Sequence, residues 1–101
     1  MSGKLERDFQ SKLIKRIKEL LPGCIVMKND PDYIQGIPDL TILYGDKWAT
    51  LECKRSMNAT HRPNQDYYVG AMNEMSFSRF ICPENEKEVL GELQSALRID
   101  R

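Results

Sequence analysis

The segment that decides the fold is DLTILYGDKWATLECK, residues 39–54. Two runs rich in β-branched and aromatic residues flank the dipeptide Gly45-Asp46. This pattern predicts a β-hairpin with a two-residue turn, which glycine at the first turn position favours. Pairing then continues outward from the turn residue by residue, and it puts Asp39 opposite Glu52.

The predicted hairpin brings two carboxylates together at its open end. The Cβ atoms of Asp39 and Glu52 would lie roughly 5 Å apart, and Lys54 would emerge on the same face because it follows Glu52 by two residues. Like charges directly opposite each other are destabilising, and a divalent cation bound by both carboxylates removes that cost; oxygen ligands suit magnesium. A solvated hairpin face explains the same charges equally well when the pattern is taken alone.

The elements around the hairpin follow from hydrophobic periodicity and from the turn residues. They predict an α/β fold, in the order αβββαβα, with a mixed sheet flanked by helices and one domain over residues 1–101. The flanking elements are a helix over 5–21, a strand over 24–27, a loop over 28–37, a helix over 63–75, a strand over 77–82 and a last helix that opens at Pro83.

Two polar residues occupy apolar helix faces. Glu6 lies near the middle of the apolar stripe of the first helix, and Gln65 leads the face formed by Tyr68, Val69 and Met72. A carboxylate directed into a fold is costly without a partner, which favours a functional Glu6, although the start of a helix also suits a solvated acid. For Gln65 taken alone, a buried amide satisfied by backbone groups is the favoured explanation.

Composition excludes several classes of protein. The chain has 101 residues, zero net charge, three cysteines and a single histidine. It lacks an apolar run of membrane-spanning length, paired cysteines of a secreted scaffold and zinc-ligand spacing. Zero net charge argues against a simple DNA-binding domain but permits a nuclease, in which a bound cation adds positive charge. The first ten residues are charged and do not form a secretory signal, so we expect a cytoplasmic protein.

Taken together, these residues resemble the PD-(D/E)XK nuclease superfamily. The matching features are Glu6 on a first helix, the motif GIPDL at residues 36–40, the triplet Glu52-Cys53-Lys54 and Gln65 on the next helix. The GIPDL motif and the trailing glutamine are most similar to the VRR-NUC branch, the virus-type replication-repair nucleases. The resemblance implies a restriction-endonuclease-like core, a Mg²⁺- or Mn²⁺-dependent endodeoxyribonuclease and a bacterial or phage source.

The resemblance also implies a role for each matched residue. Asp39 and Glu52 would ligate the metal with the Cys53 backbone carbonyl, and Glu6 would reach it through water. Lys54 would orient the attacking water and stabilise charge on the phosphate, and Gln65 would position Lys54 or the water. The family pattern has a small or β-branched apolar residue where this chain has Cys53, whose side chain we expect in the core.

Other residues near the motif are weaker candidates for a functional role. Arg55, Arg62 and Arg79 are the candidates for DNA binding, whereas His61 is interpreted as an exposed loop histidine. The lysines of the first helix, with Arg16, are interpreted as its solvated face. Trp48 and Tyr67 are interpreted as packing residues.

Three functions remain open from the sequence. The resemblance to Holliday junction resolvases favours a structure-selective endonuclease that acts as a homodimer on branched DNA such as four-way junctions. The interface would draw on apolar residues such as Tyr33, Ile34, Phe77 and Phe80. The alternatives are a general or restriction-type DNA nuclease of the same fold and a catalytically silent nucleic-acid-binding protein.

Overall fold

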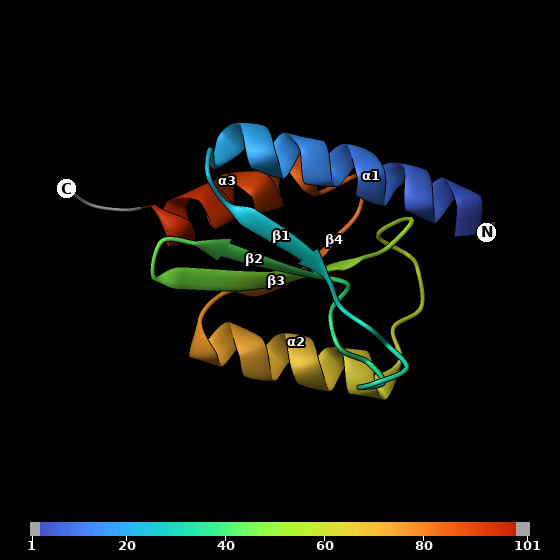
Figure 1. Cartoon of the computed structure of the whole chain (residues 1–101). Helices are drawn as coiled ribbons and strands as arrows, with labels where there is room; N and C mark the ends of the chain where they lie inside the picture. The colour runs from blue at the N-terminus through green and yellow to red at the C-terminus, as the bar shows by residue number, and fades with distance from the viewer. Residues whose placement is uncertain (1–2, 99–101) are drawn as a thin grey trace.

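The computed structural model describes residues 3–98 as an α/β fold with three helices and one four-stranded sheet (Figure 1). The predicted order αβββαβα is confirmed within these residues. The elements are α1 (Gly3–Leu20), β1 (Ile25–Lys28), β2 (Leu40–Tyr44), β3 (Lys47–Cys53), α2 (Pro63–Met75), β4 (Ser78–Ile81) and α3 (Glu86–Leu97).

The sheet has the order β1-β2-β3-β4 and is mixed. β1, β2 and β3 pair antiparallel, and β4 runs parallel to β3. Tyr44 pairs with Lys47 and Leu40 with Leu51, so the predicted hairpin register is confirmed. Gly45 has φ of 63°, and no non-glycine residue within 3–98 has a positive φ, which is the pattern of a type II′ turn.

The two faces of the sheet are covered differently. Figure 1 shows α1 and α3 over one face and α2 over the other. Because side chains alternate along a strand, one set of hairpin residues packs into the core beneath α1 and α3. The fully buried core residues include Leu13, Ile17, Leu40, Ile42, Ala49, Leu51, Ile81 and Leu93. The alternate set, which includes Thr50 and Glu52, faces α2.

The last helix begins later than the sequence predicted. α3 starts at Glu86, not at Pro83, because residues 83–85 form a turn closed by Asn85. The Asn85 side chain accepts the N–H of Cys82 at 2.8 Å and donates to the carbonyl of Phe80 at 3.2 Å. These bonds tie the turn to the end of β4, so the backbone enters the helix three residues later.

The exposed fractions of several aromatic side chains differ from what the sequence pattern indicated. Tyr67 is 66% exposed, so its interpretation as a packing residue is wrong. It follows Gln65 by two positions, about 200° around the helix, and therefore points away from the face that meets the sheet. Phe77 is 5% exposed and belongs to the core, so it is not available to an interface, whereas Tyr33 is 84% exposed.

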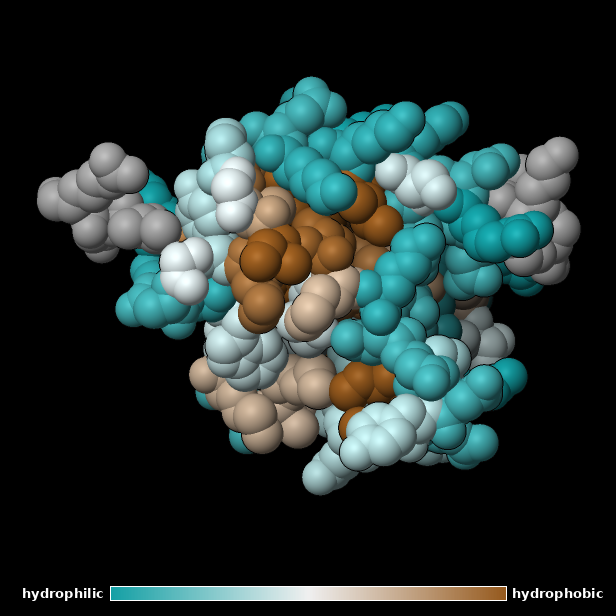
Figure 2. Space-filling model, in the orientation of Figure 1, coloured by the Kyte–Doolittle hydropathy of each residue, from teal (hydrophilic) through white to brown (hydrophobic). Residues whose placement is uncertain are grey.

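Apolar surface remains uncovered on the first two strands. Ile25, Met27 and Leu43 are exposed, and Ile25 pairs with Leu43 across β1 and β2. Figure 2 shows apolar residues gathered on the side of the molecule where β1 lies. No helix in the described part of the chain is long and apolar enough to cross a membrane.

Candidate active site

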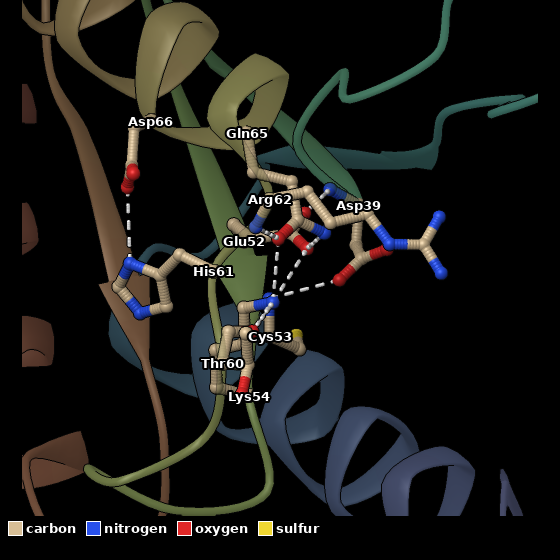
Figure 3. A network of polar contacts seen from close by, with 9 residues as sticks. All are labelled: Asp39, Glu52, Cys53, Lys54, Thr60, His61, Arg62, Gln65 and Asp66. Carbon is tan, nitrogen blue, oxygen red and sulfur yellow. Dashed lines mark hydrogen bonds and ion pairs between the residues drawn. The ribbon is translucent and has the colours of Figure 1, made fainter.

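The hairpin register brings Asp39 and Glu52 together at the edge of the face that α2 covers (Figure 3). Asp39 directly precedes β2, and Glu52 lies one residue before the end of β3. The Asp39 N–H donates to Oε1 of Glu52 at 3.1 Å, and the N–H of Cys53 donates to Oδ2 of Asp39 at 2.8 Å. Each carboxylate is thus held by a backbone amide of the opposite strand.

Gln65 connects this pair to Lys54. Nζ of Lys54 donates to Oε1 of Gln65 at 2.6 Å, and Nε2 of Gln65 donates to Oε2 of Glu52 at 2.9 Å. An ammonium group can only donate and a carboxylate can only accept, so a single amide satisfies both. Nζ of Lys54 also donates to the Thr60 carbonyl at 3.1 Å and lies 4.0 Å from Oε2 of Glu52. Gln65, the polar residue that begins the apolar face of α2, therefore points into the site.

Burial controls the charge of the two carboxyl groups. Burial raises the pKa of Glu52 to about 8, and the neighbouring charge of Asp39 adds to this effect while Lys54 opposes it. Burial also raises the pKa of Asp39, against the lowering effect of the Cys53 N–H. Two like charges this close resist ionising together, so the pair retains a proton near neutral pH. A bound cation would favour the fully ionised pair.

The donor set fits a hard divalent cation. An ionised carboxylate offers about four lone-pair sites, and the described hydrogen bonds use two at Glu52 and one at Asp39. Both side chains supply oxygen, the ligand atom that Mg²⁺ and Mn²⁺ prefer. Magnesium commonly takes one or two carboxylates and completes its coordination with water and phosphate.

Glu6 lies near the pair without joining it. Its side chain is half-buried on the first turns of α1, and its charge contributes to the raised pKa of Asp39. Within residues 3–98, no group of three His, Cys, Asp or Glu side chains has the arrangement needed to hold a metal ion. The structure thus brings together two of the three predicted carboxylates, and a contact of Glu6 through water stays a prediction.

Cys53 confirms the prediction made for its side chain. It is 1% exposed and packs in the core, on the face opposite to Glu52. Burial raises the pKa of the Cys53 thiol, so the group stays neutral and acts as a small apolar side chain.

The three candidate DNA-binding arginines are placed differently. Arg55 and Arg62 are exposed, and the N–H of Arg62 donates to Oε1 of Gln65 at 3.0 Å, directly beside the site. Arg79 lies on β4 opposite Leu51, on the face away from Glu52. Its guanidinium donates to Glu92 at 3.2 Å and lies over the ring of Phe77, so the structure does not bring it to the carboxylates.

Two groups near the site were not among the site residues predicted from the sequence, and His61 is the exposed loop histidine that we expected. His61 hydrogen-bonds to Asp66 at 3.0 Å and stacks on Phe80, which neighbours Glu52 on β4. The Asn29 side chain hydrogen-bonds within the segment that carries Asp39. The sequence signal for Asn29 was the dipeptide Asn29-Asp30 before Pro31, which indicated only a loop.

No family model, curated protein or solved structure matches this chain. We therefore infer the function of the chain from the geometry and chemistry of the residues described above.

Proposed function

We propose that this protein is a Mg²⁺- or Mn²⁺-dependent endodeoxyribonuclease of the PD-(D/E)XK type, with a restriction-endonuclease-like core of the VRR-NUC kind. The observation that carries the proposal is the buried Asp39–Glu52 pair joined to Lys54 through the amide of Gln65. The ion held by the two carboxylates and the Cys53 carbonyl would lower the pKa of a bound water and stabilise charge on the phosphate.

Lys54 supplies a positive charge that is both oriented and largely desolvated. Its ammonium group has three donors, of which two are used by Gln65 and the Thr60 carbonyl. The third can donate to the attacking water or to a phosphate oxygen. The Lys54 side chain is only 12% exposed, and a charge acts more strongly where less water screens it.

Gln65 acts as a positioning residue. Its Oε1 accepts both the Lys54 ammonium and the backbone N–H of Arg62, at the start of α2. Because the helix start and the lysine share this acceptor, the docking of α2 sets the position of the lysine. In the proposed reaction Lys54 would therefore stay directed at the phosphate, and Glu52 would help to hold the ion.

We further propose a homodimer that acts on branched DNA inside the cell. A protein–DNA interface buries on the order of 1,000 Å² or more, which is a large demand on a neutral chain of 101 residues, and two-fold pairing is the commonest way to extend a surface. The exposed Ile25, Met27 and Leu43 support an interface at β1 and β2. The free cysteines of the structure agree with a reducing, cytoplasmic environment.

Cleavage of a DNA panel tests the proposal. Linear duplex, a flap and a four-way junction are incubated with the wild type in Mg²⁺, in Mn²⁺ and in a chelator. We expect metal-dependent nicking with preference for the junction, and nicking that is slower by about a hundredfold or more with Lys54→Ala. Lys47→Ala is the matched control, because Lys47 lies at the other end of the hairpin and donates to the Arg98 carbonyl.

Each alternative has its own outcome. Equal cutting of all substrates would indicate a general or restriction-type nuclease and overturn the branched-DNA proposal. DNA binding without cleavage in either metal would indicate a catalytically silent binding protein. Light scattering measures the mass in solution, and a monomer at micromolar concentration would contradict the dimer.

A further inference from the structure

The backbone of Asp39 is held from the β1 side by Asn29. β1 ends at Lys28, which pairs with Leu40, and the N–H of Asn29 donates to the Asp39 carbonyl at 2.8 Å. The ladder between β1 and β2 therefore continues one residue beyond the strand, at the residue that carries a candidate metal ligand.

The side chain of Asn29 holds the chain on both sides of Asp39. Its Nδ2 donates to the Pro38 carbonyl at 2.8 Å and lies 2.8 Å from Oγ1 of Thr41. The Thr41 hydroxyl in turn donates to Oδ1 of Asn29 at 3.1 Å. Residues 38, 39 and 41 are thus all bonded to one asparagine, through its backbone N–H, its Nδ2 and its Oδ1.

This restraint acts at the end of a segment without regular secondary structure. The ten residues from 29 to 38 form no strand or helix, and Pro38 has no N–H to contribute to the sheet. Asp39 and Thr41 share one face of β2 because they are two residues apart. A group that holds Thr41 and Pro38 therefore helps to set the direction in which the Asp39 side chain leaves the strand, together with the Cys53 N–H that holds its carboxylate.

We propose that Asn29, through Thr41, is a positioning residue for the metal-binding carboxylate of Asp39. The proposal rests on the proposed metal-dependent function. Outer groups that orient a ligand commonly change metal affinity by about 10–100-fold when removed. Asn29 would contact neither metal nor DNA, and it would act through Thr41 and the backbone around Asp39.

Direct Mn²⁺ binding, measured by calorimetry without DNA, tests the proposal. Asn29→Ala and Thr41→Val should each weaken Mn²⁺ binding by about tenfold or more, whereas Thr41→Ser, which keeps the hydroxyl, should bind as the wild type does. The same ranking should appear in the Mn²⁺ concentration that gives half-maximal cleavage, with a smaller change in the rate at saturating Mn²⁺.

Thr50→Val is the control for a purely structural effect. Thr50 pairs with Thr41 across the hairpin, but its buried hydroxyl bonds to Ser78 at 2.7 Å. This variant should lower the melting temperature and leave Mn²⁺ affinity unchanged.

The outcomes separate this inference from the proposed function. Suppose that the wild type binds Mn²⁺ and cleaves DNA, and that Thr41→Val binds Mn²⁺ with the same affinity. This result would overturn the role of Asn29 and leave the nuclease proposal standing. A wild-type protein that binds no Mn²⁺ and cuts no DNA would overturn both. Should Asn29→Ala fail to fold, the comparison of Thr41→Val with Thr41→Ser decides the question.

Discussion

The buried carboxyl pair gives the metal-free protein a stability that falls as the pH rises. Glu52 has an ordinary pKa of 4.5 in the unfolded chain, whereas burial and the charge of Asp39 raise its pKa to about 8 in the fold. Between these values the folded state binds more protons than the unfolded state, so the free energy of unfolding decreases with pH. The pKa of Asp39 is raised as well, which adds an effect of the same sign.

The size of the loss of stability follows from the width of the pH range between the two pKa values of Glu52. A fully developed difference of one bound proton changes the free energy of unfolding by about 1.4 kcal/mol per pH unit. Raising the pH from 5.5 to 7.5 should therefore cost roughly 2–3 kcal/mol, and a domain of this size loses about 4–8 °C of melting temperature per kcal/mol. The exposed Glu84 has a lowered pKa, so its contribution is complete above pH 4.5 and does not vary in this range.

Thermal melting followed by circular dichroism at pH 5.5, 6.5 and 7.5, with a chelator present, measures the effect. The melting temperature should fall by about 10–20 °C across the series. Glu52→Gln, which cannot ionise, should remove most of the slope. Adding Mg²⁺ or Mn²⁺ should restore stability most at pH 7.5, because the ion binds the ionised pair. A melting temperature that stays constant or rises from pH 5.5 to 7.5 in the chelated wild type would refute the reasoning.

Three further predictions concern catalysis, the loop before Asp39 and the thiols. In single-turnover cleavage, Lys54→Ala should lose about a hundredfold or more in rate and Gln65→Ala about tenfold; wild-type rates in Lys54→Ala would refute the mechanism. Gly36→Ala should destabilise by about 2 kcal/mol or more in urea, because φ is +88° and the added Cβ would lie 2.6 Å from Cγ of Asn64; an unchanged midpoint would contradict this. All three cysteines should be free thiols, so all three should be alkylated when the protein is denatured without reductant; mass spectrometry showing a disulfide would contradict the proposed cytoplasmic placement.

The pairing of Asp39 with Glu52 was predictable because it depends on local rules. A two-residue turn at Gly45-Asp46 sets the register, and a slip of one residue would turn every core side chain to the other face. The inward direction of Gln65 was predictable for a similar reason, since it shares the helical period of Val69 and Met72. Both inferences use only the geometry of one hairpin or one helix.

The contacts between elements were decided by the tertiary structure. Local periodicity does not say how far a helix slides along a sheet, so it left open whether Gln65 would reach Lys54 and Glu52. Nor did it predict that Arg79 would pair with Glu92 on α3. Glu6 shows the same limit, because its helix face was predictable but its distance from the carboxyl pair depends on how α1 packs against the sheet.

Asn29 illustrates the difference most clearly. In the sequence it is one polar residue in a turn-rich segment, and its amide has no preferred partner there. Its hydrogen bonds to Pro38 and Thr41 exist because β1 lies beside β2 and ends at Lys28, the residue directly before Asn29. Side-chain periodicity predicts the face on which a residue lies, whereas the partners of a half-buried polar group depend on which strands and helices surround it once the core has packed.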